Sequence, residues 1–302
     1  MATLLAFLTL LFYAIIPLAG AYQVRHGWRR LRQWVTSAAA SRPLTFQALQ
    51  TIQPDQGPYR LVGALEAFEG RDTLWIGNDT VSVAVNLRGV EVYFLENPDE
   101  GAEVQDPPRK VAWTRLGVLP EGTRFVVWGH LTPGNSGATN ALRFAAAPAR
   151  PLLVVAFSGE ETTVLERLVR DSRQPIEHWN PATPVSLVIG FAALLVASYW
   201  ELRSPGARAI GLIGLALALL PSTFFLPPGI VFFYGFARLW AQSRQLRARR
   251  DVLVFRSQAA GAEARLAGTQ ARQREVIANV ILLVGAGLNA LLLVTLLRWT
   301  IP

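Results

Sequence analysis

The sequence predicts an α+β membrane protein, with about four transmembrane helices and a small antiparallel β-barrel or sandwich domain that ends in a helix. Two observations predict this class. Four blocks of 20 or more residues carry no charged side chain, and about 20 apolar residues span a hydrocarbon core of ~30 Å. Between the first two blocks, a polar region shows the period-two alternation that is typical of half-buried strands.

Composition supports a membrane protein and excludes thiol chemistry. Apolar residues make up 51% of the chain and charged residues only 17%, against a usual share of about 25%. The net charge is +8, and Lys110 is the only lysine. The arginines lie beside apolar runs, which favours membrane lipids over nucleic acid as their partner. No cysteine is present, so disulfides, cysteine-ligated clusters and thiol nucleophiles are excluded. The Arg-, Ala- and Gly-rich composition is typical of a bacterial protein, hence of an inner-membrane location.

The first block, within residues 1–24, predicts an uncleaved transmembrane anchor. A secretory signal begins with basic residues, whereas this chain begins "MATLL". The basic residues follow the apolar run instead, as Arg25, Arg29, Arg30 and Arg32.

The next membrane region, residues 179–240, contains "LALALLPSTFFLPPGIVFFYGFARLW" and a predicted break at 221–228. Its uncharged block 209–237 has 29 residues, and two full crossings need at least about 17 residues each. Pro227 and Pro228 should interrupt the helix. We therefore expect one broken crossing, with the helix restarting after Pro228. The alternative is a hairpin at the prolines, which would make five transmembrane helices.

Basic flanks predict the orientation, because short arginine-rich flanks prefer the cytoplasm. The flank 25–32 and the segment 238–274, with nine arginines and two acids, both favour the inside. One broken crossing places the β domain in the cytoplasm. A hairpin makes it extracytoplasmic.

The soluble β-rich domain is predicted over residues 43–175. Its alternating stretches and turn residues predict strands near 59–68, 72–77, 80–87, 90–95, 110–117, 123–131, 140–146 and 151–156. The segment 97–108 is a polar, acidic loop. A helix follows, with Ser158 as its expected cap and an apolar stripe of Val164, Leu165, Leu168 and Val169.

The order of "GTRFVVWGHL", "ALRF", "RPLLVVAFS", the helix "EETTVLERLV" and a membrane segment resembles the GIDE-type domain of membrane-embedded ubiquitin ligases and related bacterial and archaeal proteins. The resemblance covers about residues 110–200. It implies a β-rich domain followed by a helix that leads into the bilayer, and in the ligases this domain faces away from the cytosol. Ligase activity needs a zinc-binding RING with Cys ligands, which a chain without cysteine lacks.

Motifs for catalysis, cofactors and metals are not recognised. His26, His130 and His178 have no partner at ligand spacing, and His26 and His178 are expected at membrane borders. No serine elbow or phosphate loop is formed. An acidic set resembles no EF-hand loop and is interpreted as a solvated loop: it comprises Glu91, Glu96, Asp99, Glu100, Glu103 and Asp106. Trp113 and Trp128 are expected to be core aromatics.

The arginine-rich helical segment 241–275 precedes the last transmembrane helix, 276–298. Arg244, Arg247, Arg249 and Arg250 could bind anionic lipid at ~1 kcal/mol each near the surface, or an acidic partner; alternatively they only determine topology. A pair of protruding helices is expected here.

Two sets of small or polar residues lie inside the apolar blocks, and both are interpreted as helix packing or, alternatively, as a polar pathway. They are Ser186, Gly190, Ala193 and Ala197, and Asn279 with Asn289. No ionisable residue lies inside a block, which disfavours a proton-coupled transporter.

These observations predict an integral membrane protein of non-enzymatic type whose β domain is a protein-interaction or assembly module, and they are compatible with a homo-oligomer. The alternatives are a channel or lipid-handling membrane protein, or an accessory subunit of a membrane enzyme that uses the acidic loop.

Overall fold

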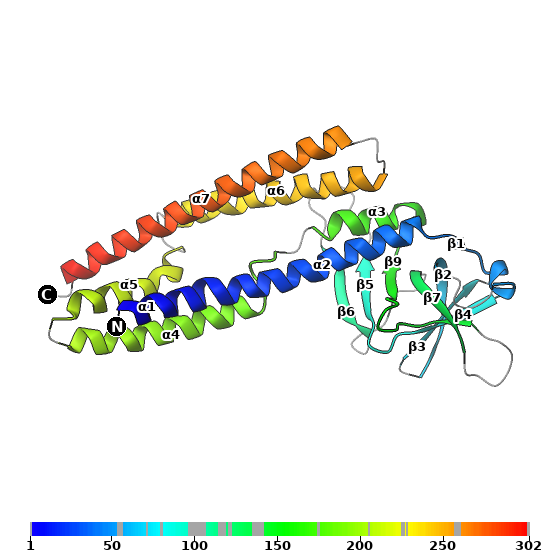
Figure 1. The fold of residues 1–302 in the computed structure, drawn as a ribbon, viewed down its shortest axis with the longest axis horizontal. Helices are drawn as coiled ribbons and strands as arrows, with labels where there is room; N and C mark the ends of the chain where they lie inside the picture. The colour runs from blue at the N-terminus through cyan, green and yellow to red at the C-terminus, as the bar shows by residue number, and fades with distance from the viewer. Residues whose placement is uncertain are drawn as a thin grey trace. The chain divides into compact units, whose positions relative to one another are not determined.

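A computed structural model describes residues 2–300 except 53–56, 71, 79–80, 96–106, 114–118, 120–122, 135–141, 174–175, 205, 225–226, 228 and 257–260. The chain forms two compact units (Figure 1). Residues 29–174 make one unit, and residues 1–28 together with 175–302 make the other.

The unit of residues 29–174 is built around a closed five-stranded barrel, so the barrel alternative holds and the sandwich does not. The strands follow the order β2-β3-β4-β8-β7, and β7 pairs again with β2. Their bounds are β2 Pro58–Glu69, β3 Thr73–Asn78, β4 Val81–Asn86, β7 Arg124–Pro133 and β8 Leu142–Phe144. A barrel of this kind belongs with the small Greek-key barrels, a group that includes the OB fold.

Further strands extend the sheet from both sides of the barrel. β9 pairs with β7, β5 with β9, and β6 with β5, while β1 pairs with β2. Their bounds are β1 Pro43–Leu44, β5 Glu91–Leu95, β6 Arg109–Ala112 and β9 Leu153–Phe157. The sheet was predicted to be antiparallel, yet the pairs β1–β2, β4–β8 and β5–β9 are parallel. Periodicity identifies a strand but not its neighbour, which explains this error.

β9 is buried along its whole length. Val154 and Ala156 belong to the core cluster that fills the barrel, and the alternate residues face the other side of the sheet. Two helices of this unit are attached to the sheet: the C-terminal part of α2 (Ile16–Ala40) and α3 (Glu161–Asp171). Strands buried on both faces read as continuous apolar runs, which accounts for the sequence "LLVVAF" at 152–157.

Hydrogen bonds and an ion pair hold these helices to the sheet. Arg60 Nη1 donates to the carbonyl oxygen of Ala38 at 3.3 Å. Trp128 Nε1 donates to Ser41 Oγ at 2.8 Å. Arg124 pairs with Glu161 at 2.9 Å. Leu31, Val35 and Ala38 of α2 are fully buried, so the unit begins well before the predicted domain start at residue 43.

α3 has the predicted apolar stripe but not the predicted cap. Val164, Leu165, Leu168 and Val169 are buried. The N-cap is Glu160, whose side chain makes no capping bond, and the helix begins at Glu161. Gly159 has φ +101°, so a turn separates Ser158 from the helix.

The other unit is helical. Its elements are α1 Ala2–Leu10, the π-helical turn η1 Leu11–Ile15, the start of α2, α4 Ala182–Arg203, α5 Arg208–Thr223, α6 Gly229–Arg256 and α7 Gly261–Thr300. Among the described residues, three helices are long and apolar enough to cross a membrane: Ala2–Ala40, Ala182–Arg203 and Gly261–Trp299. Four crossings were predicted, one of them as a broken helix over 209–237. The described helices do not confirm this fourth crossing, because α5 and α6 are two separate helices there.

α5 and α6 follow one another in the same direction and do not form a hairpin (Figure 1). α5 packs antiparallel on α4 and also contacts α7, whereas α6 lies along α7. Contacts of Gly211 with Leu202 and of Gly214 with Ser198 mark the α4–α5 pairing. Pro221 lies inside α5 and Pro227 in the connecting turn, and proline cannot donate a helical hydrogen bond.

We predict that Phe125→Ala destabilises the barrel by about 3–5 kcal/mol, because it empties a fully buried site. Phe68→Ala is the matched control, since its ring is 48% exposed, and it should cost less than about 1 kcal/mol. Urea unfolding of the full chain in micelles, followed by tryptophan fluorescence, measures both. Equal losses would contradict the assignment of Phe125 to the core.

Candidate functional site

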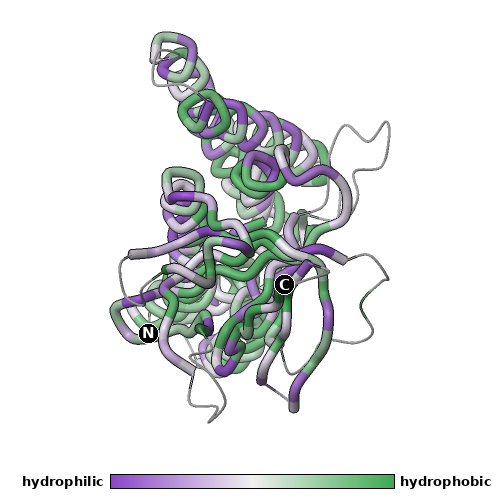
Figure 2. The backbone as a smooth tube through the Cα atoms, turned by 90° about the vertical axis from the view of Figure 1, so that its right-hand side faces the viewer, coloured by the Kyte–Doolittle hydropathy of each residue, from purple (hydrophilic) through white to green (hydrophobic). Residues whose placement is uncertain are grey.

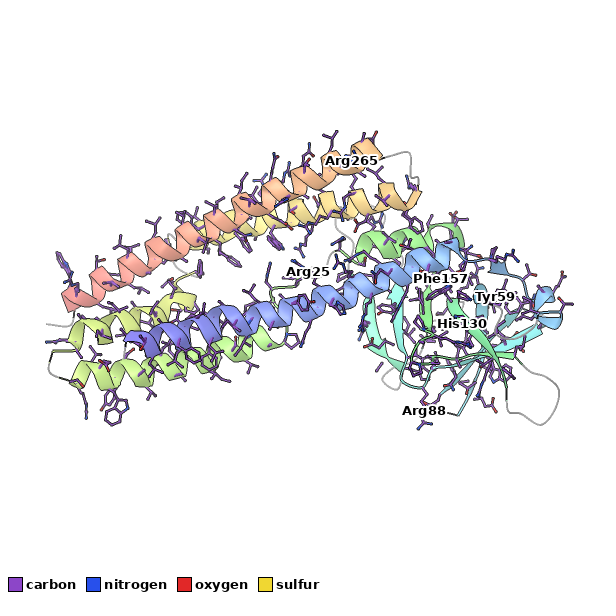
Figure 3. The ribbon with its side chains drawn as sticks, viewed as in Figure 1. Arg25, Tyr59, Arg88, His130, Phe157 and Arg265 are labelled. Atoms are coloured by element: carbon purple, nitrogen blue, oxygen red, sulfur yellow. The ribbon has the colours of Figure 1, made fainter. Side chains whose placement is uncertain are left out.

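The helical unit brings charged and aromatic side chains together at one place, which we name the polar junction: Arg25, Glu177, His178, Trp240 and Arg244. Arg25 of α2 donates through Nε and Nη2 to Glu177 Oε2 at 2.8 and 2.7 Å. The His178 ring lies 4.5 Å from the Trp240 ring of α6. Arg244 follows one turn later on α6 and interacts electrostatically with Glu177 and His178. Figure 3 labels Arg25 on α2.

Asn180 positions the segment that carries Glu177 and His178. Its Oδ1 accepts a hydrogen bond from the Ala182 amide at 3.0 Å, at the start of α4. Its Nδ2 donates to the carbonyl oxygen of Pro17 at 3.2 Å. A Cβ atom on Gly20 would lie 2.2 Å from Asn180 Oδ1, so α2 needs glycine there. The segment is thus attached to α2 on one side and begins α4 on the other.

The surroundings of His178 favour its neutral form. Its Nε2 is buried and has no hydrogen-bond partner in the part of the chain that the structure describes. Burial is the main cause that lowers the pKa of His178; Arg25 and Arg244 lower it further, while Glu177 and Glu275 oppose them. The residue therefore packs as an uncharged ring at neutral pH.

α6 and α7 continue from the junction as a closely packed hairpin. Ala264, Ala267 and Ala271 are buried between the helices, and Ser243 Oγ donates to the carbonyl oxygen of Ala271 at 3.0 Å. Arg274 Nη1 donates to Gln242 Oε1 at 2.6 Å. Small side chains allow this close approach. Figure 2 shows the backbone coloured by hydropathy, with both hydrophilic and hydrophobic residues in the helices.

The four arginines predicted to bind anions do not form one surface. Arg247 pairs with Glu275, and Arg250 pairs with its neighbour Asp251 at 2.7 Å. Arg244 belongs to the polar junction. Arg249 is exposed. Acids of the same hairpin thus neutralise two of the four predicted contacts.

The predicted small-residue face of α4 packs against the π-helical turn η1. Ser186 Oγ donates to the carbonyl oxygen of Phe12 at 2.9 Å. A Cβ atom on Gly190 would lie 2.6 Å from Phe12 Cβ. Ser186, Gly190 and Ala197 are buried, while Ala193 is only partly buried. The contacts favour helix packing over a polar pathway at this face.

Exposed aromatic residues gather near both ends of the apolar helices. One group is Tyr22, Trp179 and Tyr234, and the other is Tyr199, Trp200 and Trp299. Such belts are typical of the two membrane–water interfaces, and the 22 residues of α4 rise about 33 Å. Trp240, by contrast, is buried against His178 and Phe236.

Three other residues considered in the sequence, Trp113, Trp128 and His130, belong to the unit of residues 29–174. Trp128 is a core residue, as expected, and Trp113 is partly buried, 5.1 Å from the Phe68 ring. His130, labelled in Figure 3, has a buried Nδ1 without a hydrogen-bond partner among the described residues.

Of the acidic set, only Glu91 lies among the described residues. Glu91 pairs with Lys110 at 2.6 Å. The other five acids, Glu96, Asp99, Glu100, Glu103 and Asp106, lie outside the described residues. His26 stacks on Tyr22, with ring centres 6.1 Å apart.

Sequence reasoning missed the polar junction because its members are far apart along the chain. Arg25 and Glu177 are separated by 152 positions, and no local pattern connects them. The available signal was the pair Glu177–His178 directly before an apolar block, where ionisable residues usually need partners.

The described residues contain no group of three or more His, Cys, Asp or Glu side chains that could hold a metal ion. Comparison of the chain with protein-family models, curated proteins and solved structures gave no match. The fold therefore defines a mixed α/β protein with a five-stranded barrel and apolar helices that are long enough to span a membrane. The resemblance to the GIDE-type domain stays a prediction.

We predict that acid loosens the polar junction through His178. Burial holds its folded-state pKa below the unfolded value, which is about 6.5. The unfolded chain therefore takes up the proton first, and stability present above about pH 6.5 is lost as the pH falls below it. His178→Phe keeps a ring against Trp240 but removes this loss. Melting temperatures of the protein in micelles, from about pH 7.5 to about pH 5, measure the difference.

His26→Phe is the control for this comparison, because His26 is exposed and should leave the acid sensitivity unchanged. Carboxylates contribute to acid unfolding in every variant, so the test is the difference between variants. An equal fall in melting temperature for wild type and His178→Phe would show that His178 is not the responsible group.

Proposed function

We propose that the chain is an integral membrane protein of non-enzymatic type whose barrel serves as a protein-interaction or assembly module. The observation that carries this proposal is the filled barrel interior. Phe125, Leu131 and Phe144 are fully buried in it, and a small barrel packed with side chains has no room for a ligand inside. Contacts with other molecules must therefore use the outer surface and the connecting loops.

The helical unit supports a four-crossing arrangement in a bacterial inner membrane. Three helices have the length and composition of membrane spans. α5 has 16 residues, which rise about 24 Å, and the apolar start of α6 continues in the same direction. Together they supply the fourth crossing as one broken helix. The absence of a hairpin between these described helices favours four crossings over five.

The arginine distribution supports a cytoplasmic barrel and a cytoplasmic α6–α7 hairpin, with the N-terminus outside. The resemblance to the GIDE-type domain argues for the opposite side, because that domain faces away from the cytosol in the ligases. The orientation therefore needs a direct measurement, which the cysteine-free chain makes simple.

We predict that Arg88→Cys, in the exposed turn before β5, and Arg265→Cys, on the exposed face of α7, are both protected from a membrane-impermeant maleimide in intact cells. Both positions are labelled in Figure 3. Ser204→Cys, between α4 and α5, is the positive control and should react. Reaction at Arg88→Cys with Arg265→Cys protected would place the barrel outside.

The assembly role predicts discrete protein contacts on the barrel. A photoreactive phenylalanine analogue placed at Phe68 of β2 or at Arg109 of β6, both exposed, should give a defined protein adduct in native membranes. The same probe at Val188 or Leu283, which are exposed on apolar helices, should give lipid adducts. An adduct of twice the chain mass would identify a homo-oligomer. Absence of any protein adduct from a scan of exposed barrel positions would overturn the proposal.

The alternative of a channel or lipid-handling protein is favoured by one specific feature. The apolar block is broken between α5 and α6, and a buried asparagine of α7 lies against the break.

A further inference from the structure

The end of α5, the start of α6 and one side chain of α7 meet at a single point. α5 ends at Thr223 and α6 begins at Gly229. A Cβ atom on Gly229 would lie 2.3 Å from the carbonyl oxygen of Thr223 and 2.5 Å from Asn289 Nδ2. Glycine is therefore required at position 229. Because it has no side chain, the Thr223 carbonyl oxygen and Asn289 Nδ2 can both lie close to its backbone.

Asn289 differs from the other polar side chains of the apolar helices. It is 3% exposed, and its Nδ2 has no hydrogen-bond partner in the described part of the chain. Ser198 donates to the carbonyl oxygen of Leu194 at 2.6 Å, and Tyr13 donates to that of Ala218 at 3.2 Å. Asn279, the other asparagine predicted to act on this helix, is exposed. An unpaired buried amide is costly, so Asn289 needs an acceptor.

The break lies near the middle of the apolar span. Asn289 is 13 positions after Val276 (289 − 276) and 10 before Trp299 (299 − 289), or about 20 Å and about 15 Å along the helix. In membrane proteins, interrupted helices at this depth bind polar ligands, because irregular backbone persists there only where its polar groups are satisfied.

The groups at the break select a ligand that both accepts and donates hydrogen bonds. Asn289 Nδ2 and the first N–H groups of α6 are donors, and the carbonyl oxygen of Thr223 is an acceptor. A bare anion would face this carbonyl, and a bare cation would face the donors. Water satisfies both kinds of group, and a buried water normally makes about three hydrogen bonds.

We infer that the break between α5 and α6 is a hydration site in the middle of the membrane span, where water accepts from Asn289 Nδ2 and donates to the Thr223 carbonyl. This inference is independent of the role proposed for the barrel. The aromatic rings of Phe224 and Phe233, 6.5 Å apart, flank the break, and Phe224 follows Thr223 directly.

Hydroxyl-radical labelling tests the site, because radicals formed from bound water modify the nearest aromatic ring. The full chain in lipid nanodiscs would be irradiated in ¹⁸O-water and its phenylalanines analysed by mass spectrometry. Phe224 should gain ¹⁸O, whereas Phe191 on α4, 38% exposed, should not. Asn289→Leu should abolish the labelling of Phe224, and the control Asn279→Leu should preserve it. Labelling of Phe224 no greater than that of Phe191, or unchanged in Asn289→Leu, overturns the inference.

Thermal unfolding is an independent readout. If Asn289 were dry and unpaired, leucine of similar size would remove an unsatisfied group and raise the melting temperature. If water satisfies the amide, Asn289→Leu loses those hydrogen bonds, and the melting temperature stays level or falls. A rise of several degrees in the melting temperature of Asn289→Leu would overturn the inference even if Phe224 were labelled.

Discussion

Within an apolar helical unit, each buried polar group must find its partner inside the protein, and the arrangement of these helices depends on that constraint. The π-helical turn at 11–15 presents the Phe12 carbonyl to Ser186, and Tyr13 reaches the Ala218 carbonyl. Asn180 accepts a hydrogen bond from the Ala182 amide at the start of α4 and donates one to the Pro17 carbonyl. These hydrogen bonds join η1 and α2 to α4 and α5. Apolar contact alone would discriminate poorly between helices in lipid.

The same constraint explains two ion pairs of the helical unit, which lie beyond the uncharged blocks. Arg25 with Glu177 and Arg247 with Glu275 combine opposite charges from different elements. His178 remains neutral between them because burial opposes its protonation. A neutral imidazole against Trp240 connects the segment before α4 to α6 without an additional buried charge.

In the barrel unit, β9 is buried on both faces, so its residues do not alternate between buried and exposed positions. β9 lies between β7 and β5 and has no exposed residue. One sheet thus closes a barrel through β7 and continues through β9 to β5. The same sheet holds α2 through Arg60 of β2 and α3 through Arg124 of β7. This arrangement joins strands that are distant in sequence, and parallel pairs result where the chain returns to the sheet in the same direction.

Local chemistry determined the elements of this protein. Hydropathy and length predicted the apolar helices, alternation predicted the strands near 59–68 and 123–131, and Pro227 with Pro228 predicted an interrupted helix. Those features arise from neighbouring residues, so the sequence by itself was sufficient. Tertiary structure decided which strands pair, that α5 and α6 run in succession, that Arg25 meets Glu177, and that Asn289 rather than Asn279 is buried at the break. These depend on residues far apart in the chain, whose proximity is created only when the elements pack.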